Sequence, residues 1–428
     1  MIKEDFLQDD LSIRGNHIGD FRRALAIVDK HTKAVKINTN DFTVLSYTEV
    51  PKGEDGYLYF FALPAGKPWK GAEGDKLPLG RIKKENILKR GGLELIKEMS
   101  NGVKTLIMLH GEIYFLSNLS IDSLGRRANF SGRRLLENDL ARNINLAQGF
   151  KTHVSQFNGT MVYRKCKQIK KAFAVFSEKY TYVPQSILST IIDNLDAEQT
   201  LGDMECKEWE VNHSMSKIFI EFPDKGHSLQ QTYGLPDKFI PGLYLATSDT
   251  GHSSLTALPT WKVGGSVSYG VQMNEGGKRR HSGDVDPEEF AKSIGDNIFK
   301  QYTKLPERLG ELLAIDITNP NWNLNDSKDR RANKEAVSAA IKDTFKQLKM
   351  VKKVGKKLEV ELYESLCGEI DPSLLYTAYD IATAVMELAS RVDGIADSTR
   401  RNLQQTISNA PFCTFKKPNT NSKITLTA

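Results

Sequence analysis

The sequence predicts an α+β fold with a mixed or antiparallel β-sheet core, carboxyl-terminal helices and a separate β-rich amino-terminal region. Short apolar or alternating runs, divided by turns rich in Gly and Pro, dominate the chain up to Gly283. After that point, apolar residues recur at helical spacing. The composition, with 39% hydrophobic and 26% charged residues, is typical of a folded globular protein and excludes a wholly disordered chain.

The amino-terminal domain is expected to span residues 1–120. Its predicted strands are Phe42 to Tyr47, Tyr57 to Leu63 and Lys104 to Leu116. Met1 to Asp10 carries acids where a secretory signal has a basic and then an apolar region, so we expect no export signal.

The central domain is expected to span residues 121–285 and to mix strands with helices. A strand should enter a basic segment within Gly159 to Phe176, and a helix is predicted from Pro184 to Leu195. Strand-like stretches follow in Glu208 to Phe222 and in Phe239 to Ala246.

The carboxyl-terminal region, residues 286–410, is predicted to be helical, and residues 411–428 should form a flexible polar tail. Asp371 with Pro372 is expected to open one helix that runs to about Val392. An earlier helix, Ala332 to Lys357, interleaves apolar residues with lysines. The lysines whose spacing places them along one side of that helix are Lys342, Lys346, Lys349 and Lys353.

The net charge of +6 hides a strong segregation of charge. From Arg126 to Lys179 there are twelve Lys and Arg residues against three acids, and from Lys328 to Lys357 there are eleven against three. The first basic window therefore carries +9, the second +8, and the rest of the chain −11. Such asymmetry is typical of proteins that bind polyanions. The alternative, that these runs are only solvated faces, stays open at this point.

The sequence points to loops and faces that can contact phosphates and stack bases. Arginine on Gly-punctuated loops suits phosphate, and Phe130, Tyr163 and Tyr180 are candidates for stacking. The predicted nucleic-acid-binding residues are Arg126, Arg127, Arg133, Arg134, Arg164, Lys165, Lys170, Lys171, Arg279, Arg280, Lys342, Lys346, Lys349 and Lys353.

No residue pattern establishes a catalytic or metal site. The eight histidines show no HxxxH, HExxH or HxH spacing, and the four cysteines show no CxxC, so we predict no metal and no cofactor. A GxSxG elbow is absent, so no catalytic residue is assigned. Two loops crowded with Ser, Asp and Gly form a possible site, with candidates Ser248, Asp249, His252 and His281.

Three segments resemble a known family in order and spacing. They are AVFSEKYTYVPQSILSTIIDNL (Ala174 to Leu195), PGLYLATSDTGHSSLTALPTW (Pro241 to Trp261) and RRHSGD (Arg279 to Asp284). Over roughly residues 126–410 the chain resembles the phage- and plasmid-like proteins grouped as domain of unknown function number 932. It departs from them at Glu178-Lys179, where an Arg is frequent, and at Gly264 to Ser266, where many members carry a Cys-Asn turn.

The resemblance implies a bacteriophage, prophage or plasmid origin and a place in the host cytoplasm during infection. Together with the charge segregation it predicts a non-enzymatic protein that binds single-stranded DNA, or anneals it, in phage DNA metabolism and recombination. We expect a homo-oligomer without a membrane partner. Two alternatives stay open: a phage structural or host-interaction protein, and an enzyme acting on nucleotides or nucleic acid at the two loops.

Overall fold

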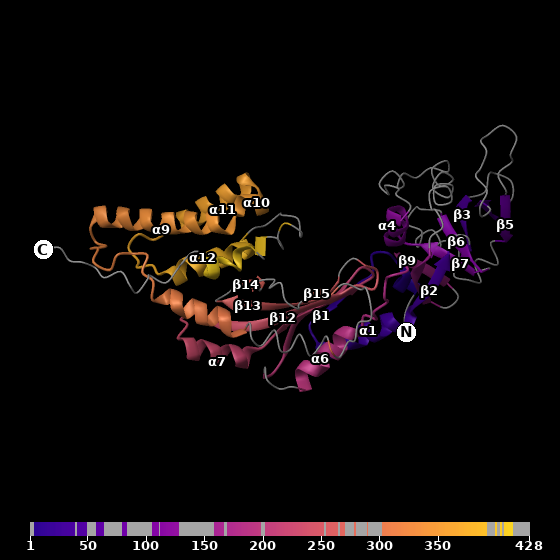
Figure 1. The fold of residues 1–428 in the computed structure, drawn as a ribbon, viewed down its shortest axis with the longest axis horizontal. Helices are drawn as coiled ribbons and strands as arrows, with labels where there is room; N and C mark the ends of the chain where they lie inside the picture. The colour runs from indigo at the N-terminus through magenta and orange to yellow at the C-terminus, as the bar shows by residue number, and fades with distance from the viewer. Residues whose placement is uncertain are drawn as a thin grey trace.

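The structure is a computed structural model, and the residues that it describes fall into separate ranges. These are residues 4–38, 41–48, 57–63, 79–83, 105–110, 112–127, 158–166, 169–197, 202–251, 254–263, 266–269, 278–279, 289, 302–391, 399, 403–404 and 406–413. The predicted α+β class is confirmed, with two β-sheets and a set of carboxyl-terminal helices (Figure 1).

The first sheet, called the central sheet, is antiparallel throughout. Alternation of apolar residues along its strands points Trp209, Ile218, Leu243 and Leu245 to one side, where all four are buried. Its order is β1 (Ser12–Gly15), β10 (Glu205–Asn212), β11 (Ser216–Glu221), β12 (Phe239–Thr247), β13 (Leu255–Val263) and β14 (Ser266–Tyr269), with β15 (Lys278–Arg279) also pairing with β13.

The second sheet, called the distal sheet, is mixed, because β7 and β9 run parallel while its other pairs are antiparallel. Its order is β2 (Thr32–Asn38), β8 (Asn158–Cys166), β9 (Ile169–Ser177), β7 (Glu112–Leu116), β6 (Thr105–Leu109), β3 (Phe42–Thr48), β4 (Tyr57–Leu63) and β5 (Leu79–Lys83).

The amino-terminal strands are shared with later segments of the chain. β1 pairs with β10 of the central sheet, and β2 pairs with β8 of the distal sheet. The β-rich amino-terminal region is present, but the boundary expected at residue 120 does not separate the two sheets. The physical reason is that an edge strand gains hydrogen bonds from whichever open edge the chain reaches, regardless of distance in sequence.

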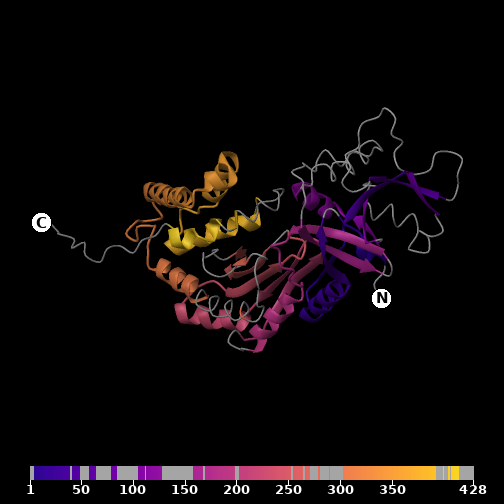
Figure 2. The same ribbon diagram turned by 45° about the vertical axis from the view of Figure 1, so that its right-hand side comes forward.

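Helices cover both sides of the central sheet, as two views of the molecule show (Figures 1 and 2). α1 (Ile18–His31), α6 (Ile187–Ala197) and α7 (Pro223–Tyr233) lie along one side, and α12 (Ala378–Arg391) lies against β14 on the other. α4 (Asn118–Arg127) packs on β9 of the distal sheet. The remaining elements are the 3-10 helix η1 (Glu4–Leu7), α9 (Ser327–Leu348), α10 (Met350–Val354), α11 (Lys356–Gly368) and α14 (Ala410–Cys413), with a further helical stretch at 302–313.

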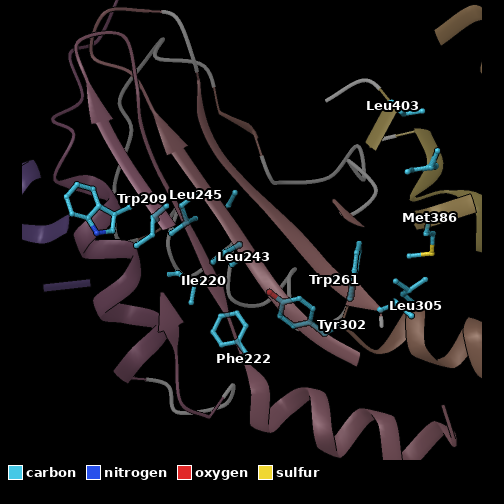
Figure 3. Close-up of a cluster of buried hydrophobic side chains, with 14 of the residues drawn as sticks. Trp209, Ile220, Phe222, Leu243, Leu245, Trp261, Tyr302, Leu305, Met386 and Leu403 are labelled. Atoms are coloured by element: carbon cyan, nitrogen blue, oxygen red, sulfur yellow. The ribbon is translucent and has the colours of Figure 1, made fainter. Parts of the chain in front are cut away.

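One hydrophobic core joins the central sheet to the carboxyl-terminal helices. Figure 3 shows Trp209 and Leu245 toward one end of this cluster, and Leu305 and Met386 at the other. Tyr302 is fully buried and donates its hydroxyl hydrogen to the Gly242 carbonyl at 2.7 Å. The helical region is therefore packed into the same core as the sheet.

The start of one helix differs from the prediction. The helix expected to open at Asp371 begins at Ala378, because the Asp371 carboxylate instead accepts the Ser373 backbone N–H and hydroxyl and closes a turn. Asp380, in the first turn of α12, accepts the Thr377 backbone N–H at 2.6 Å. Within the residues that the structure describes, no helix has the length and apolar character needed to cross a bilayer.

Candidate nucleic-acid interface

The first basic window is divided by the alternation of side chains along β8 and β9. Arg164 and Lys171 point into the protein and are 0% exposed, whereas Lys165 is exposed and Lys170 is half-buried. Adjacent residues of a strand face opposite sides of a sheet, so a run of neighbouring cations cannot all reach solvent. Arg164 pairs with Lys171 across the strands, and Lys165 pairs with Lys170. The paired strands β8 and β9 therefore contribute one inward and one outward pair of cations.

Arg164 lies at the centre of a buried polar network that joins the two sheets. Its Nη2 donates to Oδ1 and Oδ2 of Asp249 at 3.0 Å each, and its Nε lies 3.3 Å from Thr32 Oγ1. Its Nη1 contacts Nδ1 of His213. Gln185 Nε2 also donates to Asp249 Oδ1, at 2.8 Å. Because Arg164 belongs to the distal sheet while Asp249 and His213 follow central-sheet strands, the network ties the sheets together.

His213 is neutral in this network. A guanidinium N–H can only donate, so Nδ1 of His213 accepts and the ring hydrogen sits on Nε2. Burial, followed by the positive charges of Arg164 and Lys171, lowers the pKa of His213 well below its ordinary value of 6.5.

Lys171 makes a second buried ion pair. Its Nζ lies 2.6 Å from Asp9 Oδ1 and donates to the Leu7 carbonyl at 2.9 Å. Burial lowers the pKa of Lys171, and the carboxylate of Asp9 acts in the opposite direction. Buried charges persist in proteins when they are paired in this way. The prediction that Arg164 and Lys171 contact phosphate is therefore wrong, because both side chains form ion pairs in the interior.

The prediction of a loop site is also wrong for Ser248 and Asp249, the two candidates that the structure describes. Ser248 and Asp249 are both 0% exposed. Ser248 Oγ lies 3.1 Å from Thr250 Oγ1, which donates to the His213 carbonyl at 3.1 Å. This turn closes the interior network and does not open to solvent, because Asp249 is the counter-ion that the buried Arg164 requires.

The outward pair lies beside two tyrosines. Lys170 Nζ is 2.6 Å from Glu112 Oε2 and 5.3 Å from the centroid of the Tyr114 ring. Tyr163 meets Tyr114 edge to face, with centroids 5.0 Å apart. Lys165 extends to solvent next to this pair. Tyr114 is 5% exposed and Tyr163 is half-buried, so the exposed portion of this cluster consists of Lys165 and part of the Tyr163 ring.

Tyr180, predicted to stack bases, is engaged inside the protein. Its ring stacks on Phe176 with centroids 3.6 Å apart, and its hydroxyl donates to the Asp249 carbonyl at 3.2 Å. Burial raises the pKa of Tyr180 above its ordinary value of 10.0. Its ring packs inside the protein and is therefore not available to stack on bases.

The second basic window is exposed throughout. All eleven of its Lys and Arg residues occupy exposed positions on α9, α10 and the start of α11, or between these helices. The densest part, which we call the lysine corner, spans Lys346 to Lys357 and holds six lysines and no acid. Its lysines are Lys346, Lys349, Lys352, Lys353, Lys356 and Lys357.

The lysine corner is bent, which corrects the prediction of one continuous helical stripe. Lys349 has a left-handed φ of 55°, ends α9 and precedes α10. Phe345, Leu348 and Met350 are buried on either side of this break, so packing of apolar side chains offsets the cost of a left-handed lysine. Lys342 and Lys346 share a face of α9, whereas Lys353 belongs to α10.

Few counter-ions accompany the window among the residues that the structure describes. Arg331 pairs with Glu335 at 3.0 Å, and Lys357 lies 3.9 Å from Glu361 with both side chains largely exposed. Exposed pairs of this kind contribute about 0–1 kcal/mol. The positive field of the lysine corner is thus left almost uncompensated.

The other predicted residues cannot be placed as side chains. Only the backbone is described for Arg126 and Arg127, at the end of α4, and for Arg279 in β15. Those outside the described residues are Phe130, Arg133, Arg134, His252, Arg280 and His281.

Sequence analysis did not single out Lys352, Lys356 or Lys357. The signal was present, since no acid occurs between Asp343 and Glu359. Helical spacing selected four lysines from one assumed helix, whereas the chain breaks at Lys349 and places Lys352 on α10 and Lys356 and Lys357 at the start of α11.

No group of three or more potential metal ligands occurs within the described part of the chain. Comparison of the chain with protein-family models, curated proteins and solved structures gives no match. The resemblance to domain of unknown function number 932 therefore stays a prediction.

Proposed function

We propose that this protein binds nucleic acid, with single-stranded DNA as the favoured ligand, through the lysine corner. The observation that carries the proposal is that six exposed lysines, in a segment from Lys346 to Lys357 that contains no acid, occupy the bend between α9 and α11. A phosphate backbone is the polyanion that such a surface suits, because each contact releases condensed counterions.

Single strands are favoured by the second cationic surface. Lys165, which is exposed, lies beside the half-buried ring of Tyr163 on the distal sheet, and a ring next to a cation suits an unpaired base. A role in annealing or recombination of phage DNA, a homo-oligomeric state and a place in the host cytoplasm belong to the same proposal and draw on the family resemblance.

The test is a titration of labelled single-stranded DNA at several salt concentrations. For single strands, the slope of log K against log salt changes by about 0.7 for each phosphate contact. The variant Lys352→Gln/Lys353→Gln/Lys356→Gln should therefore reduce the slope by about 2. The control is Lys36→Gln/Lys238→Gln/Lys304→Gln, which removes the same charge from exposed positions scattered elsewhere.

The two triple variants distinguish binding at one specific surface from a general effect of net charge on binding. Binding that weakens only in the lysine-corner variant supports the proposal. An absence of binding at low salt, or equal loss in both variants, would overturn it.

A second candidate, a structural or host-interaction protein of a phage, is favoured by one observation. Leu374 and Leu375 are 54% and 65% exposed on the turn before α12. Asn333, fully buried, donates to the carbonyls of Pro372 and Leu374 at 3.0 and 2.9 Å and so fixes this turn. Mass spectrometry of purified phage particles tests the virion form of this candidate, which fails if the protein is absent from them.

A further inference from the structure

Exposed apolar side chains gather in one part of the chain. Among the residues that the structure describes, six large apolar side chains are exposed, and four of these lie between positions 351 and 375. Val351 on α10 is 49% exposed, and Val360 on α11 is 39% exposed. Leu374 and Leu375, on the turn between α11 and α12, are 54% and 65% exposed. Apolar groups concentrated at the surface with charges around them mark sites of protein–protein interaction.

Charge is segregated along the same segment. The lysine corner ends at Lys357, and no Lys or Arg occurs in the stretch that follows, from Leu358 to Ser390. Up to Leu375 this stretch holds five acids, which are Glu359, Glu361, Glu364, Glu369 and Asp371. All of them except Glu359 are exposed. The five acids nearly balance the six lysines of the corner, so this surface carries opposite charges at its two ends.

α11 connects the two ends of this surface. Its thirteen residues span about 20 Å, with the lysine corner at its start and the turn of Leu374 and Leu375 beyond its end. It packs along α9, where the Tyr363 hydroxyl donates to the Ser338 carbonyl at 3.4 Å. Figure 1 shows α9, α10 and α11 on the side of α12 that is turned away from β14.

The exposed side of α11 is complementary to a second copy of itself. Leu362 and Leu366 are buried toward the protein. Lys357, Glu361 and Glu364, spaced by four and three residues, form an exposed row on the opposite side. Two antiparallel copies of this row place the lysine end of each against the acidic end of the other. Parallel copies would place like charges together, which is unfavourable.

We propose that a second copy of this chain docks on this surface, with the two α11 helices antiparallel about a two-fold axis. The axis passes near Val360, midway between Lys357 and Glu364. Lys357 of each copy then lies opposite Glu364 of the other, and the leucine turn of each reaches the lysine corner of the other, where Val351 is exposed. Two-fold contacts of this kind are closed and reciprocal, and they are the commonest in protein dimers.

A second copy matches this surface better than a partner of one charge does. A basic partner would fit only the acidic end, and a polyanion would fit only the lysine corner, whereas a second copy satisfies both ends and covers apolar side chains at each. The inference rests on the homo-oligomeric state within the proposed function and does not require nucleic-acid binding. The contact is small, so we expect a weak and reversible dimer.

The test is sedimentation equilibrium of the full chain without nucleic acid, from about 1 to about 200 µM. We expect a dimer with a dissociation constant in the micromolar range that salt weakens, because opposite charges face each other. Lys357→Glu and Glu364→Lys should each weaken dimerisation by about ten-fold or more, because each places like charges opposite one another. Both changes suit the dipole of α11, with an acid near its start and a lysine toward its end, so the fold is kept.

An equal mixture of the two variants provides the sharpest arm. One variant carries acids at both positions and the other carries lysines at both, so the mixture should associate while neither variant does so alone. The matched controls are Lys304→Glu and Glu307→Lys, at exposed positions three residues apart in the helical stretch 302–313, which should dimerise as the unchanged protein does.

The apolar contribution has its own pair of variants. Leu375→Ser should weaken the dimer by about ten-fold, because its exposed side chain is buried only in the dimer. Ile27→Ser is the control, since Ile27 is 38% exposed on α1 and lies outside the proposed surface.

A protein that stays monomeric at every concentration overturns the proposal. It is equally overturned if Lys357→Glu dimerises as the unchanged protein does, or if the mixture of variants fails to associate. Titration with single-stranded DNA at protein concentrations below the dimer range tests the nucleic-acid proposal separately. A protein that dimerises but binds no strand contradicts only that proposal, and one that binds strands but never dimerises contradicts only this one.

Discussion

Replacing Arg164 with methionine should destabilise the protein strongly. The change keeps much of the volume of the side chain but removes its charge and its donors. Asp249, which is 0% exposed, is then left ionised in the interior with only Gln185 donating to its carboxylate among the described residues. His213 loses the donor to its Nδ1 in the same step.

The magnitude follows from the geometry of the pair. Removing one partner of a buried ion pair costs about 3–5 kcal/mol, because the other charge stays buried without compensation. The unpaired Nδ1 of His213 adds to this cost, and packing of the methionine side chain offsets part of it. We therefore expect Arg164→Met to lower the free energy of unfolding by about 4 kcal/mol. The double variant Arg164→Met/Asp249→Asn should cost less than the sum of the single variants by at least about 1 kcal/mol, since it removes both charges.

Urea unfolding followed by tryptophan fluorescence measures these differences, because Trp209 and Trp261 both lie in the core. The control is Lys165→Met, one residue away on the exposed side of β8, for which we expect a change within about 0.5 kcal/mol. A cost below about 1 kcal/mol for Arg164→Met, or strict additivity in the double variant, would refute the assignment of this network as a clamp between the sheets.

Three further changes test other parts of the structure. Since the pKa of His213 lies well below 6.5 in the folded protein, the unfolded state binds the extra proton, and stability should fall by about 1.4 kcal/mol per pH unit below pH 6.5, as urea midpoints measure. A flat profile there would contradict the burial of a neutral His213. The depressed pKa of Glu210 contributes stability above its ordinary titration range that is lost as the pH falls toward 2, so the stability difference between the protein and Glu210→Gln should shrink on acidification. Gly226→Ala places a Cβ 2.2 Å from the Phe239 carbonyl oxygen and should cost about 1–3 kcal/mol, whereas Gly368→Ala meets open space and should leave the melting temperature unchanged or higher.

The α+β class and many element positions were predictable because they depend on local pattern. The strand predicted at Tyr57 to Leu63 coincides with β4, and the helix predicted from Pro184 overlaps α6. Alternation and turn residues carry this information within a few positions. Pairing does not: Ser12 lies opposite Asn212 and Thr32 opposite Arg164, and no local pattern encodes contacts over such separations.

The candidate interface also contains features that the sequence pattern predicts and features that it does not. The exposure of Lys342 and Lys346 was predictable, since apolar residues at helical spacing define the buried face of α9. Whether Arg164 or Lys165 faces the interior was not, because the residues are adjacent and the register shifts between Val162 and Tyr163. A one-residue shift exchanges the two faces of a strand. The left-handed Lys349 was also unpredictable, since lysine carries no signal for that conformation.

The two treatments of positive charge in this protein argue for binding at the lysine corner. Arg164 and Lys171 are buried, and each has a carboxylate partner within hydrogen-bond distance, so the interior is electrically balanced. The lysine corner lacks this balance: Lys352, Lys353 and Lys356 contact no acid among the described residues. Concentrated like charge costs stability through self-repulsion and gives no packing in return. Such a surface contributes free energy only when a polyanion neutralises it, and the repulsion relieved on binding then adds to the affinity.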